Sequence, residues 1–227
     1  MSKTPTRTYI STITNVREVA LSGTADLAYW QERLRSVGLD AYAENGRASL
    51  LLTAIESKFR GIPFRELSIS VLVSDDGLTA SGAYLAHAFN SSRLLAFAER
   101  VFFRTPYHLA GLALEVRVPA RMAVSANGYE LFSARMGSQR SPARNEDNLF
   151  EGSIYLPGGR DVFYAHLSGA ADVYLFDEAD TLFFRPDSAG DIFAQLVDSG
   201  FTGGEWRLRA GAVHARSKTF KRDKGRA

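Results

Sequence analysis

The 227-residue chain contains no cysteine. Disulfides, thiolate nucleophiles and cysteine-ligated metal sites are therefore excluded together. No apolar run is long enough to cross a bilayer, and residues 1–20 lack the basic-then-apolar order of a secretory signal. We therefore expect a cytoplasmic protein without a membrane partner. The content of 45% hydrophobic residues is enough for one compact core, so we predict a single domain over residues 1–217.

Lysine is also scarce, and most of it lies at the C-terminal end. Residues 218–227 contain five basic residues and one aspartate, whereas the rest of the chain is slightly acidic. Such a segment can attract nucleic acid or anionic lipid, but short charged termini are more often simply solvated. Because no nucleic-acid motif accompanies it, we predict a disordered tail and no nucleic-acid partner.

Most of the chain has the two-residue period of β-strands. The alternation is clearest over residues 64–73, and Asn45-Gly46 and Asn127-Gly128 mark hairpins. Residues 137–148 are polar and predict a long loop. The predicted strands are 16–21, 39–43, 48–55, 64–73, 78–89, 107–118, 122–126, 129–135, 149–156, 162–167, 173–176, 181–184 and 206–216.

Three short helices interrupt this pattern. They are predicted between residues 24 and 38, between 90 and 106, and from about 190 to 198. The side chains expected to cap them are Thr24, Asn90 or Ser91, and Ser188. Many strands with few helices favour a mainly β, β-rich α+β fold, either a barrel or a sandwich with helices outside it.

One segment resembles a known family. Residues 106–110 read Pro-Tyr-His-Leu-Ala, and they resemble the Schiff-base segment of the acetoacetate decarboxylase superfamily, Gly-Arg-Glu-x-x-Gly-x-Pro-Lys-Lys-Leu-Ala. Arg100 falls on the arginine of that pattern, while Tyr107 and His108 occupy its two lysine positions. The other departures from the pattern are Glu99, Val101 and Arg104, which replace its first glycine, its glutamate and its second glycine.

The clear resemblance covers about residues 64–116. It implies a closed, cone-like β-barrel with a few peripheral helices and an apolar interior cavity, in a divergent branch that lacks the Schiff-base lysine. The family's reaction needs an amine that condenses with a ketone. Tyrosine cannot form an imine, so the resemblance favours the family's fold and pocket and argues against its decarboxylation.

Tyr107 and Glu66 are the candidate catalytic residues. The position of the first lysine implies that Tyr107 faces the cavity, where its phenol could donate a hydrogen bond to a carbonyl or act as an acid or base. Glu66 lies in a segment that resembles the family strand whose glutamate reaches toward the catalytic amine, and burial would raise its pKa. The structural alternatives are a tyrosine at the rim of a strand and a glutamate ion-paired with a nearby arginine: Arg60, Arg65 or Arg100.

Arg100, His108 and His87 are the candidate substrate-binding residues. Arg100 could hold a substrate carboxylate through two hydrogen bonds, although an ion pair at the helix end is the commoner use of such a residue. By alternation His108 points away from Tyr107, which favours a histidine in the core or the wall. His87, His108 and Glu66 could form a two-histidine, one-carboxylate iron site only with convergent geometry, so we predict no metal and no cofactor.

The sequence therefore favours an acetoacetate decarboxylase-like protein with a pocket for a small carbonyl or carboxylate compound. If it catalyses a reaction, we expect acid–base chemistry of the lyase or isomerase type on an oxo-acid-like substrate. The alternatives are a non-catalytic small-molecule-binding barrel, or an interaction module whose interior is filled. Lys58 is the one plausible replacement amine. The sequence leaves open whether the chain forms a homo-oligomer.

Overall fold

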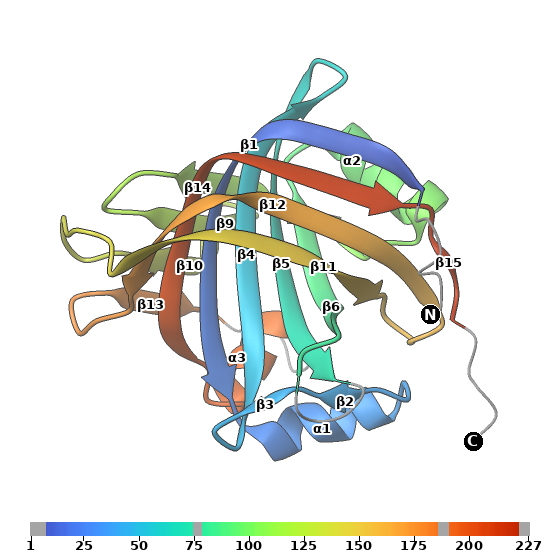
Figure 1. The fold of residues 1–227 in the computed structure, drawn as a ribbon, viewed down its shortest axis with the longest axis horizontal. Coiled ribbons are helices and arrows are strands. Elements are labelled where there is room, and N and C mark those ends of the chain that lie inside the picture. Colours follow the sequence, from blue (N-terminus) through green and yellow to red (C-terminus); the bar gives the residue numbers. More distant parts are fainter. Residues whose placement is uncertain (1–7, 75–78, 186–190, 223–227) are drawn as a thin grey trace.

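The computed structural model of the chain describes residues 8–74, 79–185 and 191–222. Two β-sheets and a few short helices form the fold (Figure 1). The predicted cap Ser188 lies outside the described residues. The mainly β fold with three α-helices that the sequence predicts is confirmed.

The larger sheet runs in the order β2-β5-β4-β1-β14-β12-β11-β6-β7. Strand β6 also pairs with β5, so the path of paired strands returns to β5. Strands on opposite sides of this ring can therefore direct side chains toward one another. The strands of this sheet are β1 (Tyr9–Ala25), β2 (Asp40–Ala41), β3 (Ala43–Glu44), β4 (Arg47–Phe59), β5 (Ile62–Ser74), β6 (Gly82–Asn90), β7 (Tyr107–Leu109), β11 (Arg144–Tyr155), β12 (Asp161–Leu175), β14 (Thr202–Ser217) and β15 (Phe220–Lys221).

The smaller sheet has the order β13-β10-β9-β8 and encloses the main core with the larger one. Its strands are β8 (Gly111–Glu115), β9 (Arg121–Ala126), β10 (Tyr129–Arg135) and β13 (Thr181–Phe184). Large buried side chains from both sheets and from two helices meet here, including Trp30, Leu52, Phe132, Phe193 and Trp206. Their burial is the dominant stabilising contribution to the fold.

Two smaller apolar clusters lie on the other face of the large sheet. One contains Leu85, Ala88, Tyr107, Leu156 and Phe163, and it is closed by Ala96 of a helix. The second is built around Phe64 and Ile55, with Leu95 of the same helix packed against it. This helix therefore covers the face from which Tyr107 projects.

The helices are α1 (Leu27–Arg35), α2 (Arg93–Ala98), the π-helix η1 (Glu99–Phe103) and α3 (Ile192–Asp198). The caps differ from the predicted ones. Asp26 caps α1, because Thr24 is still paired within β1, and Ser92 and Asp191 cap α2 and α3. The side chain of each cap accepts a hydrogen bond from a backbone N–H of the first turn.

Several strand predictions differ from the structure. The strand predicted over 39–43 is divided into β2 and β3, which pair with different strands. The strand predicted over 107–118 is divided into β7 and β8, which belong to different sheets. The two strands predicted within 162–176 are one strand, β12. Strand β11 begins at Arg144, inside the predicted loop, because charged side chains on this strand pair with β14 across the sheet surface: Arg144 binds Glu205 and Glu146 binds Arg207.

Part of the predicted tail is described. Strand β15 lies within it and pairs with β12, and Lys221 forms an ion pair with Asp161. None of the described helices is long and apolar enough to cross a membrane.

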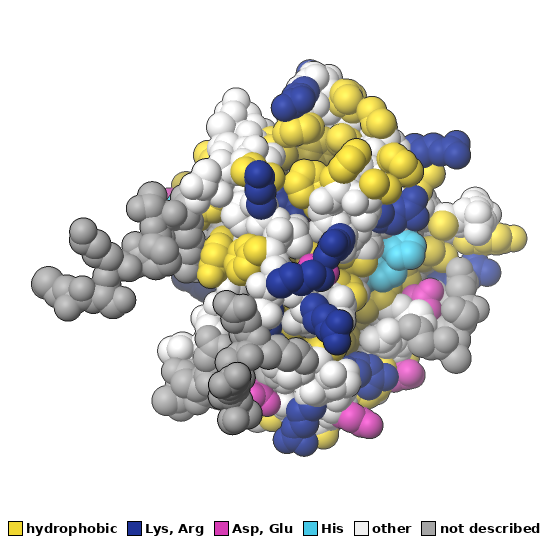
Figure 2. Space-filling model, turned by 90° about the vertical axis from the view of Figure 1, so that its right-hand side faces the viewer, with side chains coloured by type: hydrophobic (Ala, Val, Ile, Leu, Met, Phe, Trp, Pro, Cys, Tyr) yellow, Lys and Arg dark blue, Asp and Glu magenta, His cyan; other side chains and the backbone are white. Residues whose placement is uncertain are grey.

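The outer side of α2 and η1 is apolar. Leu94, Phe97, Val101 and Phe102 are all more than half exposed. Figure 2 shows the side of the molecule that lies on the right in Figure 1. Hydrophobic side chains gather there among Lys and Arg. The inner side of the same segment faces the candidate site.

Candidate functional site

The hydroxyl of Tyr107 donates a hydrogen bond to Glu66 Oε1. Two strand pairings explain this contact. Ser68 of β5 lies opposite Ala88 of β6, and Ala88 lies opposite Tyr107 of β7. Glu66 is two residues from Ser68 and therefore projects from the same face of β5. The long side chain of Tyr107 reaches across β6 to the position of Glu66, two residues along β5 from Ser68. The two residues that the sequence analysis proposed as catalytic candidates are therefore in contact.

Burial sets the protonation of both groups. Removal from water raises the pKa of Glu66 to about 7, against the hydrogen bond from Tyr107, which lowers it. The nearby charge of Glu99 adds to the rise and that of Arg216 opposes it. Burial, followed by the charge of Glu66, raises the pKa of Tyr107 well above its usual value. Near pH 7 Glu66 can therefore gain or lose a proton, while Tyr107 remains a neutral donor.

Two further charged residues complete the site. Glu99 Oε2 accepts hydrogen bonds from Arg216 Nη1 and from the hydroxyl of Thr105, each 2.7 Å long. The guanidinium of Arg216 lies between two aromatic rings, with its Cζ 4.7 Å from the centroid of Phe103 and 4.1 Å from that of Phe163. An arginine held between rings and bound to a carboxylate is fixed in orientation.

The sequence interpretation missed Arg216 and gave Glu99 no role in the site. Arg216 lies on the long strand β14, opposite Ser11 and Ala165 of the neighbouring strands. Glu99 comes from η1, which follows β6 and α2 in the chain. No local motif marks such a pair, because the two residues are 117 positions apart in the sequence and meet through the pairing of distant strands.

A break in helix geometry places Glu99. The chain leaves η1 at Arg104, which has the left-handed φ of 58°, and Pro106 cannot continue a helix. The backbone N–H of Thr105 then donates to Glu99 O at 3.2 Å, and the Thr105 side chain binds the Glu99 carboxylate. π-helical turns are frequent at functional sites because they redirect side chains within a short segment.

A second buried charged cluster projects from the same face of the large sheet. Glu66 lies opposite Ile55, Ile55 opposite Glu18, and Glu18 opposite Arg209, which makes one row across four strands. Glu18 is 2% exposed; its carboxylate accepts from Arg209 Nη1 and lies 2.7 Å from His214 Nε2. These partners hold the pKa of Glu18 below its usual value, although burial opposes them.

The remaining sequence candidates lie elsewhere. Arg100 is exposed and forms no hydrogen bond or ion pair within the described part of the chain. His87 and His108 stack on each other, with ring centroids 4.4 Å apart, and His87 also contacts Phe89 of the main core. Burial, then the charge of His108, lowers the pKa of His87 to about 4. The two histidines are thus on the opposite face of β6 and β7 from Tyr107, and His108 is exposed there rather than buried in the core.

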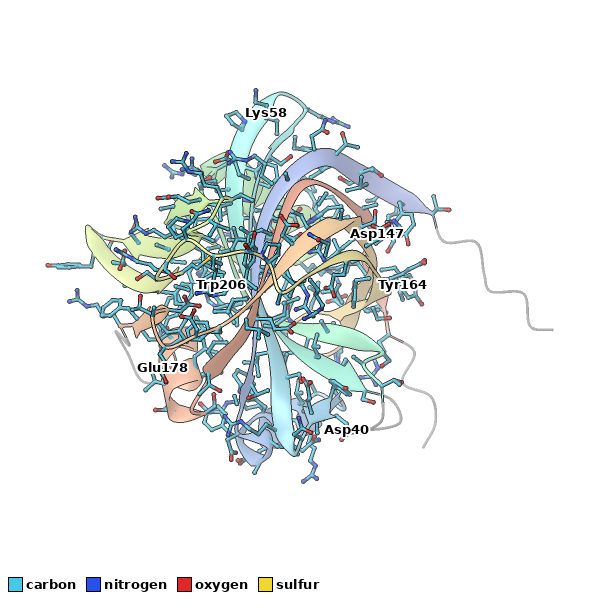
Figure 3. The ribbon with its side chains drawn as sticks, turned by 60° about the vertical axis from the view of Figure 1, so that its left-hand side comes forward. Asp40, Lys58, Asp147, Tyr164, Glu178 and Trp206 are labelled. Carbon is cyan, nitrogen blue, oxygen red and sulfur yellow. The ribbon has the colours of Figure 1, made fainter. Side chains whose placement is uncertain are left out.

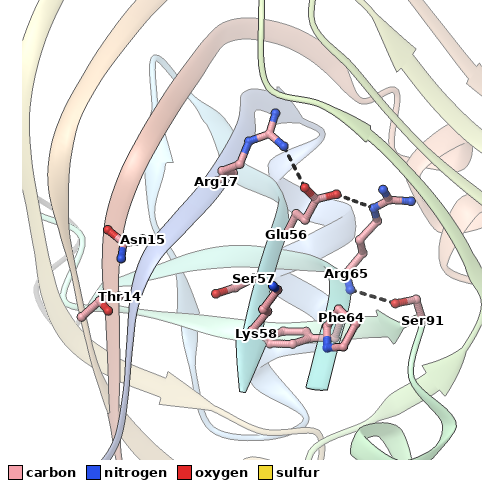
Figure 4. A pocket seen from close by; sticks show the side chains of 10 residues that line it. Thr14, Asn15, Arg17, Glu56, Ser57, Lys58, Phe64, Arg65 and Ser91 are labelled. Atoms are coloured by element: carbon pink, nitrogen blue, oxygen red, sulfur yellow. Dashed lines mark hydrogen bonds and ion pairs between the residues drawn. The ribbon is translucent and has the colours of Figure 1, made fainter. Parts of the chain in front are cut away.

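Lys58 is exposed at the end of β4, where Figure 3 shows it at the outer tip of a hairpin. It lines a hollow of about 550 Å³ with polar residues that include Glu56 and Arg65 (Figure 4). Glu56 bridges Arg17 and Arg65 there. Neither Tyr107 nor Glu66 lines this hollow.

Metal ligands are not clustered in the part of the chain that the structure describes. Within residues 8–74, 79–185 and 191–222, no group of three or more His, Asp or Glu side chains is arranged to hold a metal ion.

Comparison with solved structures identifies the fold. A scan against protein-family models and a search of curated proteins both found no match. The enduracididine biosynthesis enzyme MppR complexed with pyruvate is similar in structure, with a TM-score of 0.62, 14% identity and coverage of 96% of this chain and 93% of that one. Acetoacetate decarboxylase from Legionella pneumophila gives a TM-score of 0.64 at 12% identity, covering 97% and 92%.

An acetoacetate decarboxylase-like enzyme from Sphingomonas wittichii RW1 gives a TM-score of 0.57 at 12% identity, with 92% of each chain covered. All three likenesses extend over nearly the whole chain. The resemblance inferred from residues 64–116 therefore holds for the fold as a whole, and the chain has the acetoacetate decarboxylase-like fold.

Proposed function

We propose that this chain binds a small carbonyl compound beside Tyr107 and Glu66 and transfers a proton to or from it without forming a Schiff base. The observation that carries the proposal is the buried hydrogen bond between the phenol and a carboxyl group whose pKa is raised to about 7. A group that titrates near the working pH is the most effective acid or base. The pyruvate complex of MppR, which shares the fold, supports a small oxo compound as the ligand.

The two residues divide the chemistry of enolisation between them. The ionised carboxylate of Glu66 accepts the proton from the carbon next to the carbonyl group. The phenol has a single proton, so on ligand binding the hydroxyl of Tyr107 turns from Glu66 and donates its hydrogen bond to the carbonyl oxygen, which gains negative charge as the enolate forms. Return of the proton from Glu66 to the same or another carbon completes an isomerase-type reaction, and in the other direction the protonated carboxyl acts as the acid.

The first experiment asks whether the chain forms an imine. Incubation with acetoacetate and borohydride, followed by mass spectrometry of the intact chain, should reveal no added mass, because the Schiff-base position holds a phenol. A reduced adduct would contradict the proposal. Lys58→Arg would then show whether the exposed Lys58 is the amine responsible.

The same site could bind a ligand without catalysing a reaction. Variants of Tyr107 and Glu66 distinguish an enzyme from a binding protein. Tyr107→Phe and Glu66→Gln preserve shape, so we expect ligand affinity to stay within a few-fold while turnover falls by about 10²- to 10⁴-fold. If a broad panel of oxo acids gives no turnover although ligands still raise the thermal midpoint, the chain is a small-molecule-binding protein.

A further inference from the structure

Two N–H groups of Arg216 have no hydrogen-bond partner in the described structure. They are Nε and Nη2, and both atoms are covered by protein. The third nitrogen, Nη1, is the one that binds Glu99. In a planar guanidinium, the Nε–H and Nη2–H bonds point the same way from one edge, and together they match the two oxygens of a carboxylate.

The surroundings hold this edge in place and leave it without competition. Phe103 and Phe163 lie against the guanidinium, and Ala165 of the neighbouring strand lies opposite Arg216. Apolar neighbours offer no acceptor for the two donors. Buried donors almost always find a partner, so an unpaired pair on one edge is the feature expected of a ligand site.

The same edge is close to the proton-transfer pair. The charge of Arg216 acts on the pKa values of both Glu66 and Tyr107, and Glu99 bridges Arg216 to the π-helix that precedes Tyr107. The guanidinium also lies against Phe163, which shares an apolar cluster with Tyr107. We therefore expect a short ligand to reach Arg216 with one end and Tyr107 with the other. The exposed Arg100, which the sequence pattern put forward for a carboxylate, has no such position.

We propose that the Nε–Nη2 edge of Arg216 is a carboxylate subsite, and that the ligand is a short-chain oxo acid. Its carboxylate accepts both hydrogen bonds from Arg216, and its carbonyl group lies beside Tyr107 and Glu66. This inference rests on the proposed function, because it assigns the acid group of the same ligand.

Entry to the subsite requires local movement, because protein atoms cover both donors. The π-helix η1 carries Phe103 and Glu99 on its inner side, while Val101 and Phe102 are 54% and 72% exposed. Local openings of a surface segment cost less free energy than global unfolding. We therefore expect the backbone amides of η1 to become more protected from hydrogen exchange when the ligand binds.

The test compares two probes that differ in charge. Pyruvate and its uncharged analogue pyruvamide are titrated by calorimetry into the full chain and into Arg216→Gln. We expect the wild-type chain to prefer pyruvate by at least about tenfold, the usual scale for a charge-assisted pair. The variant should lose that preference while its affinity for pyruvamide changes less than about twofold.

Three further variants keep the result interpretable. If Arg216→Gln fails to fold because Glu99 is left unpaired, the double variant Arg216→Gln, Glu99→Gln removes both charges and should show the same loss of preference. Arg93→Gln, on the exposed side of α2, controls for net charge and should leave the preference unchanged. Arg100→Gln tests the competing arginine.

The outcomes separate this inference from the proposed function. Equal affinity of the wild-type chain for the two probes, an undiminished preference in Arg216→Gln, or loss of the preference in Arg100→Gln alone would overturn the carboxylate subsite. Binding of pyruvamide would still support a carbonyl site at Tyr107 in those cases. If neither probe binds at tens of millimolar, both proposals fail.

Discussion

Replacement of Glu18 by alanine is expected to lower the free energy of unfolding by about 3–5 kcal/mol, the range for breaking a buried ion pair by removing one partner. Glu18 is 2% exposed, and its carboxylate is the shared acceptor of Arg209 and His214. Its removal leaves Arg209, which is 9% exposed, with the Gly169 carbonyl as its remaining acceptor among the described residues. Urea unfolding at pH 7, monitored by tryptophan fluorescence, measures the effect.

Glu56→Ala is the matched control for this prediction. Glu56 also joins two basic residues, Arg17 and Arg65, but its side chain is 28% exposed and those of its partners about half exposed. Exposed ion pairs contribute only about 0–1 kcal/mol. If Glu18→Ala costs no more than Glu56→Ala, the buried cluster has no special role in stability.

Glu66→Gln is expected to stabilise the protein at alkaline pH, by about 3 kcal/mol at pH 8 when one pKa unit corresponds to 1.36 kcal/mol. The folded-state pKa of Glu66 is raised to about 7, above the value in an unfolded chain. A raised carboxyl pKa means that the wild-type protein is most stable below the unfolded-state pKa and loses stability as the pH rises through 7. Glutamine does not titrate, so the stability of the variant does not fall in this pH range. Its side-chain oxygen still accepts the hydrogen bond from Tyr107.

The pH dependence is what identifies this effect. Unfolding free energies of the wild type and Glu66→Gln should nearly coincide at pH 4.5 and diverge up to pH 8. Glu56→Gln should behave in the opposite way, because its arginine partners hold the pKa of Glu56 below the usual value. A difference between Glu66→Gln and wild type that does not grow with pH would contradict the raised pKa.

Local patterns in the sequence predicted much of this structure because they report on local geometry. The alternation over residues 64–73 separated Leu67 and Ile69, in the main core, from Glu66 on the opposite face. Pro106 marked the end of the helical segment, and the resemblance placed Tyr107 toward the interior. The helix caps were misplaced by a few residues because a strand such as β1 continues beyond its last clear alternation.

The remainder of the site depends on long-range pairing. In the sequence, Arg216 is one of several polar residues in an alternating strand. Glu99 is recognisable there only as a residue that departs from the family pattern. The pairing of strands far apart in the sequence, from β14 through β12 and β11 to β6 and on to β5, brings Arg216 and Glu99 together near Glu66. Arg100 was chosen by its position in a motif, yet the structure turns it to solvent and supplies Arg216 from a distant strand.

The proposed function rests on the claim that Tyr107 and Glu66 form a proton-exchanging pair where the acetoacetate decarboxylase pattern has its first lysine. The most direct test is a carbon-13 NMR titration of the Glu66 carboxyl group, assigned by the signal that disappears in Glu66→Gln. We predict a titration midpoint at about 7 in the wild type and a higher one in Tyr107→Phe, which lacks the hydrogen bond that lowers the pKa. A midpoint near the ordinary glutamate value of about 4.3, unchanged in Tyr107→Phe, would contradict the claim.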